Sequence, residues 1–433
     1  MKIFLVLGAL LLVHVPRVVA QQEVLSNLSP CAVSCFTDAL SKSTCTTPDP
    51  SCMCTNAPLQ AAVEQCVLSS CTVKEALTAQ NATMTLCNQK PRDNSTEIKV
   101  TDIALIVIMA FFVGIRICYK FFSPAEILFG PDDYLIVVSL LFTVAAVILG
   151  DLGAIANGLG RDIWSLRFDQ VYAFGKTFYF IEILYFSTVC ILKMSFLFFY
   201  MRIFPGPMIQ KIIWATIWFN ILFGIGFVLP AIFPCRPISF FWTNWDGEHT
   251  GRCINLNAIL WANAAISIAV DFWMLAIPLS QLMHLKLSWT KKAGVILMFC
   301  LGTFATVVSI IRLQFLISYA RTRNPTWDQA NILKWSTIEI ATGTVCSCIP
   351  SIRIILARVL PRTFGSSYDT GARHQYPSAN GRSSKGSGFP LKNIHKSGDD
   401  NAIRCTTTFE LSQAHKSDDE LELVQERYPG NNV

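Results

Sequence analysis

Charged residues are scarce in this sequence, and histidines are scarcer. Asp, Glu, Lys and Arg make up 15% of the 433 residues, and there are six histidines. There is no lysine- or arginine-rich run, so the sequence indicates no nucleic-acid partner. It also contains no pairing of a nucleophile with a base and no His/Cys cluster with metal-ligand spacing. We therefore expect that the protein is not an enzyme.

Apolar residues are abundant instead, at 52% of the chain with 30 phenylalanines. Seven apolar runs follow one another from residue 98 to 357, and each is long enough to cross a bilayer, which takes about 20 residues. The predicted spans are 100–119, 133–155, 174–200, 211–233, 256–282, 293–318 and 333–357. This pattern predicts an all-α membrane fold, a seven-transmembrane helix bundle in contact with membrane lipid.

The two ends of the chain differ from this block. Residues 1–20 combine Lys2, an apolar run and small residues before Gln21, which is typical of a signal peptide cleaved after Ala20. Residues 358–433 are rich in Ser, Gly, Asn and mixed charge, which predicts a disordered tail.

Residues 21–97 form a small polar segment that is dense in cysteine. Eight of the chain's 16 cysteines lie here, at positions 31, 35, 45, 52, 54, 66, 71 and 87. So short a segment cannot bury a large core, and we expect four disulfides, with 105 pairings open. Asn27, Asn81 and Asn94 begin Asn-X-Ser/Thr sequences, although Pro30 follows the first one closely. Disulfides and glycosylation both indicate an extracellular segment.

The extracellular location of residues 21–97 decides the predicted orientation. The distribution of basic residues does not decide it, because they are almost equally common in the loops on both sides. With the N-terminus outside, seven spans place the tail in the cytoplasm, and we expect a multi-pass protein of the plasma membrane. Cys235 and Cys253 flank a Trp-rich outer loop and are predicted to form a further disulfide.

The cysteine pattern resembles a known family. Pro30-Cys31-x3-Cys35, Cys45, Asp49-x2-Cys52-x-Cys54, Cys66-x4-Cys71 and Cys87 are similar to the CFEM domain of fungal surface and secreted proteins. The resemblance implies a compact helical domain with the bridges Cys31–Cys71, Cys35–Cys66, Cys45–Cys52 and Cys54–Cys87.

In haem-binding CFEM domains, the aspartate at the position of Asp49 is the axial ligand of ferric haem iron. A carboxylate is a hard ligand, which suits ferric iron. The alternative is that Asp49, which lies between Pro48 and Pro50, only shapes a turn. The segment has no Tyr or Trp, and its few candidates for an apolar haem face are Phe36, Met53, Val63, Val67, Leu68 and Leu77.

Ionisable side chains inside a bilayer are costly, so each is a functional candidate. Their depth along the predicted spans separates an outer layer with Glu182, Arg312 and Glu339 from an inner layer with Lys193, Asp271 and Asp133. We expect Arg312 to pair with Glu339 or Glu182, and Lys193 with Asp271 or Asp133. Such pairs either orient the helices or change partners when the bundle switches state.

The membrane block carries a second resemblance. Its motifs are Asp132-Asp133-Tyr134, Gly158-Leu159-Gly160, Lys193-x-Ser195, Tyr200-x-Arg202-Ile203-Phe204, Cys235-Arg236-Pro237 and Ser309-Ile310-Ile311-Arg312. Together they resemble the fungal rhodopsin domain family, which implies a receptor-like protein when it is joined to a CFEM domain. Arg161-Asp162 departs from the family pattern. No retinal is expected, because neither Lys193 nor Lys334 lies in mid-membrane on the predicted seventh span.

The main hypothesis is therefore a cell-surface receptor similar to G-protein-coupled receptors. It would sense an extracellular ligand through the cysteine-rich domain and outer loops, and signal to a heterotrimeric G protein through inner loops and tail. Architecture supports this hypothesis, since no diagnostic coupling motif is present. The alternatives are a surface protein that binds haem or iron through Asp49, and a structural or adhesive membrane protein.

Overall fold

The computed structural model describes residues 28–45, 50–122, 129–282 and 289–359. All of the described residues belong to one compact unit. The predicted signal peptide, Asn27, Asp49 and residues 360–433 of the predicted tail lie outside the described residues.

Residues 28–94 contain four short helices, α2 (Pro30–Ser41), α3 (Pro50–Thr55), α4 (Ala57–Ser70) and α5 (Val73–Leu86). Polar caps set where they begin. The side chains of Ser29, Asn56 and Thr72 each accept a hydrogen bond from a backbone N–H in the first turn of α2, α4 and α5. The apolar side chains form two small clusters around the disulfides. We call residues 28–94 the N-terminal domain.

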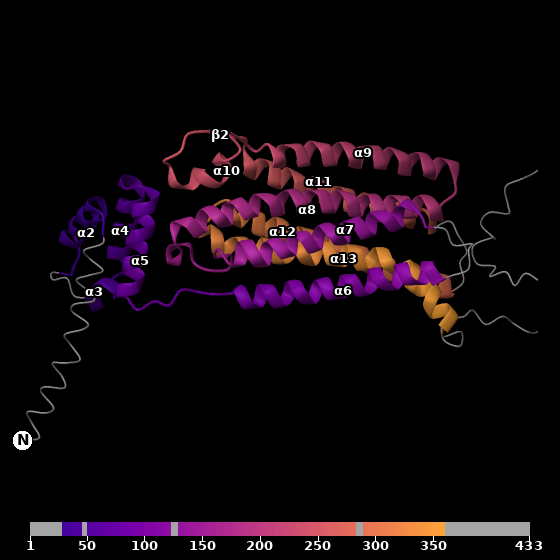
Figure 1. Cartoon of the computed structure of the whole chain (residues 1–433), viewed down its shortest axis with the longest axis horizontal. Coiled ribbons are helices and arrows are strands. Elements are labelled where there is room, and N and C mark those ends of the chain that lie inside the picture. The colour runs from indigo at the N-terminus through magenta and orange to yellow at the C-terminus, as the bar shows by residue number, and fades with distance from the viewer. Residues whose placement is uncertain (1–27, 46–49, 123–128, 283–288, 360–433) are drawn as a thin grey trace, which may run out of the picture. The chain divides into compact units, whose positions relative to one another are not determined.

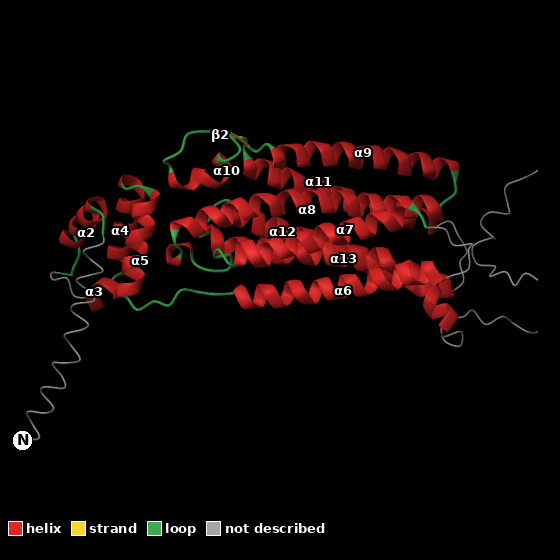
Figure 2. Cartoon of the chain, viewed as in Figure 1, coloured by secondary structure: helices red, strands yellow, loops and turns green. Residues whose placement is uncertain are grey.

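Seven long helices follow in the described part of the chain (Figure 1, Figure 2). They are α6 (Ser95–Phe122), α7 (Pro131–Leu149), α8 (Phe168–Ile203), α9 (Pro207–Ile232), α11 (Leu256–Leu282), α12 (Trp289–Tyr319) and α13 (Pro325–Val359). Each packs against the next one in the chain, and α13 packs against α6, so the helices form a closed ring. Because α13 also contacts α7 and α8, it reaches into the interior of the bundle.

The outer surface of the bundle is apolar, as membrane lipid requires. Large side chains such as Phe111, Trp218 and Leu222 are exposed. Six helices of the described residues are long and apolar enough to cross a membrane, namely all the long ones except α13. α13 has 35 residues, but the side chains near its end lie outside those described. The described structure is thus an all-α, multi-pass membrane bundle that is compatible with the seven predicted spans.

Each predicted span lies within or near one long helix, although the helices extend further at several ends. We call the end of the bundle at which α6 begins the proximal end, and the opposite end the distal end. The proximal end carries three connections, residues 156–167, 233–255 and 320–324. The second contains the paired strands β1 (Cys235–Arg236) and β2 (Arg252–Cys253) and the short helix α10 (Phe240–Thr243). These connections meet the N-terminal domain.

Candidate functional site

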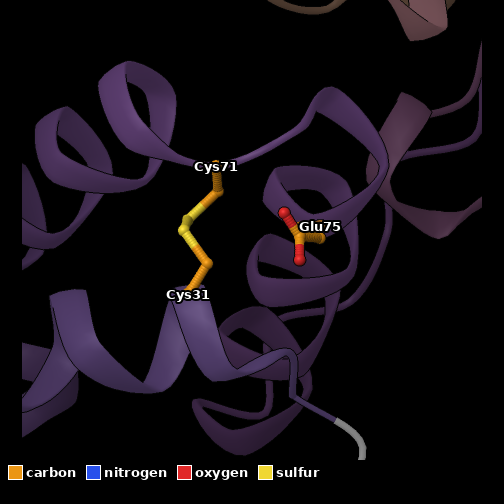
Figure 3. A group of neighbouring side chains, drawn as sticks. All are labelled: Cys31, Cys71 and Glu75. Carbon is orange, nitrogen blue, oxygen red and sulfur yellow. A yellow bond between two sulfur atoms is a disulfide. The ribbon is translucent and has the colours of Figure 1, made fainter. Parts of the chain in front are cut away.

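The eight cysteines of the N-terminal domain form four disulfides with the pairing that the CFEM resemblance implies. They are Cys31–Cys71, Cys35–Cys66, Cys45–Cys52 and Cys54–Cys87. The sulfurs of Cys31 and Cys71 and a carboxylate oxygen of Glu75 lie within 4.8 Å of one another (Figure 3). Because those sulfurs are bonded to each other and are not thiolates, the three residues do not form a metal site. Glu75 accepts hydrogen bonds from the backbone and side chain of Thr72, which lower its pKa.

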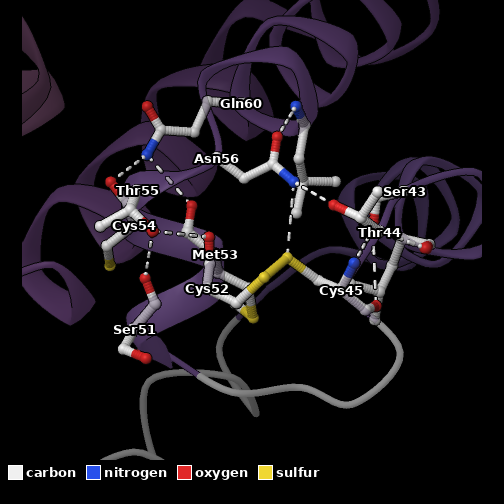
Figure 4. Close-up of a disulfide and its surroundings, with 12 residues drawn as sticks. Ser43, Thr44, Cys45, Ser51, Cys52, Met53, Cys54, Thr55, Asn56 and Gln60 are labelled. Atoms are coloured by element: carbon white, nitrogen blue, oxygen red, sulfur yellow. Dashed lines mark hydrogen bonds between the residues drawn. A yellow bond between two sulfur atoms is a disulfide. The ribbon is translucent and has the colours of Figure 1, made fainter.

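The Cys45–Cys52 disulfide borders the segment that contains Asp49 (Figure 4). Asn56 supports it, because its Nδ2 lies 3.5 Å from the Cys45 sulfur and 3.2 Å from the Thr44 hydroxyl. The same side chain caps α4 by accepting from the backbone N–H of Leu59. The proposed haem ligand Asp49 itself lies outside the described residues, so its role stays a prediction.

The apolar residues proposed for a haem face do not form one. They are Phe36, Met53, Val63, Val67, Leu68 and Leu77. Four of the six pack into the two small clusters inside the domain. Leu77 packs against the proximal end of the bundle, and Leu68 alone of the six is exposed. These six side chains therefore do not form one exposed apolar face together.

The two described glycosylation candidates differ in surroundings. Asn81 is exposed on α5, where its side chain accepts a hydrogen bond from Thr85. Asn94 is half-buried, and its backbone N–H donates to the carbonyl of Gly160 in the bundle. Asn27 lies outside the described residues. Of the described pair, Asn81 is the more accessible to a modifying enzyme.

Asp162 joins the N-terminal domain to the proximal end. The backbone N–H and the Nε of Arg92 donate to its two carboxylate oxygens at 2.8 and 3.0 Å. Asn324, which lies in the connection between α12 and α13, donates to Asp162 at 2.7 Å. The Arg92 guanidinium also lies 4.2 Å from the ring centre of Trp327, at cation–π distance. One buried carboxylate thus connects three distant segments of the chain.

Burial by itself would raise the pKa of Asp162, but the hydrogen bonds from Arg92 and Asn324 outweigh it and lower the pKa below the ordinary value. From the sequence, Arg161-Asp162 was identified only as a departure from a family motif, and the role of Asp162 in this contact was not predicted. Its partners lie 70 and 162 residues away in the chain, so no local signal identifies them.

The motif Gly158-Leu159-Gly160 shapes the adjoining turn. Both glycines have positive φ, 106° and 79°, a conformation that other residues adopt only with strain. A Cβ on Gly160 would lie 2.9 Å from the Ile98 side chain and 3.3 Å from the Ser95 backbone nitrogen. The absence of a side chain therefore lets the start of α6 approach this turn.

A second contact forms at the connection between α9 and α11, which Cys235–Cys253 closes as predicted. Lys74 of α5 lies 2.6 Å from Glu248, and this hydrogen bond raises the pKa of Lys74. Asp246 is buried there, with hydrogen bonds from Tyr172 and the backbone of Glu248. Burial would raise the pKa of Asp246, but these hydrogen bonds lower it well below its ordinary range.

Inside the bundle, Arg312 of α12 pairs with Glu339 of α13. Its Nε lies 3.0 Å from Glu339 Oε2, close enough for an ion pair although the angle is not that of a hydrogen bond. Glu339 accepts hydrogen bonds from Tyr185, at 2.7 Å, and from Ser309. Glu182, the other predicted partner, is a neighbour of this group in the lining of one cavity.

A second interior pair joins α8 to α11. Lys193 forms an ion pair with Asp271 and donates to the backbone carbonyl of Ser267 at 2.9 Å. Asp133, the alternative partner proposed for Lys193, pairs elsewhere. The structure therefore brings together one of the two predicted combinations for each basic residue.

The distal part of the bundle holds a compact cluster of four charges. Arg116 pairs with Asp132 and Asp133, and Lys120 pairs with Asp133. All four side chains are buried, and Arg116 also donates to the carbonyl of Ser347 on α13. Arg116 and Lys120 were not among the candidate residues identified from the sequence, so this cluster was not predicted. Their spacing of four residues on one helix face was the available signal.

Comparison with known proteins identifies a family for both the N-terminal domain and the bundle. A family model for the fungal rhodopsin domain matches residues 115–358, and one for the CFEM domain matches residues 24–88. A SAT4 family membrane protein of Emericella nidulans is 32% identical over 174 residues, which cover 40% of this chain and 43% of the relative.

Two further relatives are more distant. Fugralins biosynthesis cluster protein 2 of Gibberella zeae is 26% identical over 219 residues, 47% of this chain and 53% of that protein. Receptor GIN3 of Arthrobotrys oligospora is 23% identical over 206 residues, 48% of this chain and 49% of that receptor. The chain thus spans about half the length of the curated relatives it matches. No solved structure matches it.

Proposed function

Because the chain belongs to the fungal rhodopsin domain family, we propose that it is a cell-surface receptor that senses an extracellular cue. Its CFEM domain and the proximal connections read the cue. The distal end and the C-terminal tail pass the signal to a cytoplasmic partner, for which a heterotrimeric G protein is our candidate.

The observation that carries this proposal is the direct contact between the CFEM domain and the bundle. Arg92 and Lys74 of the domain meet Asp162 and Glu248 of two proximal connections. Asp162 is bonded in turn to Asn324, directly before α13. A ligand that displaced or clamped the domain would therefore act on the proximal ends of several helices at once, and α13 extends through the bundle toward the distal cluster.

The buried ion pairs support the second half of the proposal. Charges inside a membrane protein are costly to retain, and they commonly mark places where helices exchange partners. The Arg312–Glu339 pair, the Lys193–Asp271 pair and the Arg116 cluster occupy successive depths of the bundle. A shift of α13 would alter the first and third of these, since Glu339 and the carbonyl of Ser347 both belong to it.

We place the CFEM domain outside the cell and the distal end in the cytoplasm. Four disulfides in a domain this small need an oxidising compartment, and an odd number of spans then puts the tail inside. A relative that is named as a receptor supports the functional class.

A signalling assay tests the proposal. Cells that express the full chain and a fluorescent cAMP reporter are exposed to a panel of culture filtrates and host-surface extracts. We expect a response that requires the chain, that is lost in Arg312→Ala at equal surface expression, and that persists in Asp49→Ala. If no extract and neither variant changes any output, the receptor proposal is wrong.

Ferric haem binding by the CFEM domain is a second candidate function. The match to the CFEM family over residues 24–88 favours it, whereas the six apolar side chains proposed for a haem face do not form one exposed face together. Asp49 would hold the iron, and the bound group would supply redox or iron-delivery chemistry. A Soret shift of ferric haem on adding the purified chain, and its loss in Asp49→Ala, would support this function; no shift with the intact chain would exclude it.

A further inference from the structure

A cavity of about 90 Å³ lies within the bundle below the proximal end. Side chains of α6, α7, α8, α11, α12 and α13 line it, together with Leu159 of the adjoining connection. The lining is mostly apolar and includes four aromatic rings, those of Phe178, Tyr185, Phe186 and Tyr319. An apolar cavity of about 150 Å³ can hold benzene, so this one has space for a smaller organic molecule of a few non-hydrogen atoms.

Two carboxyl groups in the lining lack a basic partner. Asp102 of α6 is 7% exposed, and its Oδ1 has no hydrogen-bond partner. Glu182 of α8 lines the same cavity. Within the described ranges, no lysine or arginine forms an ion pair with either group. A buried carboxyl without a charged partner is costly, and a buried oxygen without a hydrogen bond calls for an explanation such as a bound molecule or ion.

Arg312 also lines the cavity, yet its charge is already compensated. It is 3% exposed, and the carboxylate of Glu339 lies 3.0 Å from its Nε. Asp102, Glu182 and Glu339 supply three carboxyl groups against the single positive charge of Arg312. A cation that enters the cavity can pair with a carboxylate that otherwise has no counter-ion, whereas an anion finds no free positive charge in the described lining, so a cationic ligand is favoured.

We propose that this cavity binds a small organic ammonium ion. The ammonium group donates an N–H to Oδ1 of Asp102, with Glu182 as a second counter-ion. The apolar part of the ligand packs against the aromatic rings, which also attract a cation over their faces. An inorganic cation fits less well. Calcium and magnesium need six or more oxygen ligands, and the lining of this cavity is chiefly hydrocarbon.

The binding itself is independent of the receptor proposal, but a role for the amine as the sensed cue rests on that proposed function. A neutral, a cationic and an anionic probe of nearly equal size separate the chemistry. n-Butylammonium, n-butanol and butanoate are each added to the full-length chain in lipid nanodiscs at pH 7. Saturation-transfer NMR measures binding, and the thermal midpoint of unfolding provides a second readout.

We expect n-butylammonium to bind and to raise the thermal midpoint as its concentration increases, and n-butanol and butanoate to bind at least tenfold more weakly. Asp102→Asn removes the negative charge at constant size and should weaken the binding of n-butylammonium at least tenfold. Glu182→Gln should weaken this binding by a smaller factor. Asp169→Asn changes an exposed carboxylate outside the cavity and should leave binding unchanged. Equal binding of the three probes, preference for butanoate, or unchanged affinity in Asp102→Asn would overturn the proposal.

Ala146→Leu gives an independent test if Asp102→Asn does not fold. Ala146 lines the cavity on α7, so the larger side chain should block n-butylammonium while both carboxyls remain. Binding that persists in a folded Ala146→Leu chain places the amine elsewhere and refutes the site. Amine binding without a cell response to the amine contradicts only its role as the sensed cue, whereas a cell response to an extract without amine binding contradicts only the cavity site.

Discussion

Ion pairs hold the CFEM domain against the bundle, and ion pairs also connect the helices inside the bundle, but their surroundings differ. In the pair between Arg323 and Glu64, the side chains are 72% and 53% exposed, whereas Arg116 and Asp132 in the distal cluster are 1% and 3% exposed. Water screens the first pair and competes for both of its partners. The second has no water to replace a lost partner, so its loss leaves an uncompensated charge.

This difference in exposure corresponds to two different roles of the ion pairs. In the receptor that we propose, contacts that are individually weak allow the CFEM domain to move relative to the proximal end when a ligand binds. The buried clusters keep the helices in register in this proposal, so that a movement at one end is passed on to the other. Asp162 and Asp246 stand between the two cases, since they are buried but lie at the contact with the domain.

Arg116→Ala should cause the largest loss of stability. It leaves Asp132 and Asp133 buried with Lys120 as their remaining cation, and removal of one member of such a group costs about 3–5 kcal/mol. Unfolding is measured by reaction of a thiol dye with buried Cys348, in a chain in which the other cysteines outside the five disulfides are replaced by Ala, namely Cys118, Cys190, Cys300, Cys346 and Cys405. Arg116→Leu combined with Asp132→Leu should recover part of the loss, because it removes opposite charges together. A single variant that unfolds like the parent would show that the cluster is not a structural requirement.

Loss of the Cys35–Cys66 disulfide should destabilise the CFEM domain alone. The paired change of both residues to Ser removes a bridge across 31 residues, and loss of a native disulfide from a small domain typically costs about 2–5 kcal/mol. Limited proteolysis should cleave residues 28–94 faster, while the thiol reaction of Cys348 in the bundle stays slow. If both regions unfold together, the domain and the bundle form one cooperative unit and the comparison fails.

The Asp162 contact should depend on pH. Its carboxyl has a lowered pKa in the folded chain, so it contributes stability above the ordinary aspartate value of about 3.9, and this contribution is lost as the pH falls through the lowered folded value. Protection factors for hydrogen exchange of residues 92–98, which correct for the slower intrinsic exchange in acid, should therefore stay high at pH 5–7 and fall only at lower pH.

Arg92→Ala supplies the matched test at neutral pH. It removes hydrogen-bond donors from a buried carboxylate, at a cost of about 1–3 kcal/mol, and it should accelerate exchange over the same residues without acid. Asn324 still donates to Asp162 in this variant, which limits the loss. Exchange that is equally slow in Arg92→Ala, or a transition near pH 6 in the parent, contradicts this account of Asp162.

The membrane architecture could be predicted because it depends on local composition. Apolar runs identify helices that cross a bilayer wherever their partners lie, and the helices begin and end within several residues of the predicted spans. The disulfide pairing could not be derived from spacing, since 105 pairings were open, and it came from the CFEM resemblance.

The polar contacts were predicted less completely, for a physical reason. Arg312–Glu339 and Lys193–Asp271 were among the predicted combinations, because opposite charges at equal depth in a bilayer attract one another. Arg116 and Lys120 were not among the predicted residues, since they lie at the end of the predicted span 100–119. Asp162 was missed because its partners depend on how loops meet in three dimensions, which no local pattern records.

Arg323→Ala should have the smallest effect of the set. Its partner Glu64 and Arg323 itself are both more than half exposed, and exposed pairs contribute about 0.2–1 kcal/mol. We expect slightly faster hydrogen exchange in α4 and at the start of α13 at low salt, and no difference from the parent at 1 M salt, where the Debye length falls to about 3 Å. The exposed neighbour Arg321 is the matched control, because Arg321→Ala removes the same charge two residues away. A loss above about 1 kcal/mol that persists at high salt would show that this contact is desolvated when the domain is docked, and that the domain is fixed to the bundle rather than free to respond to a ligand.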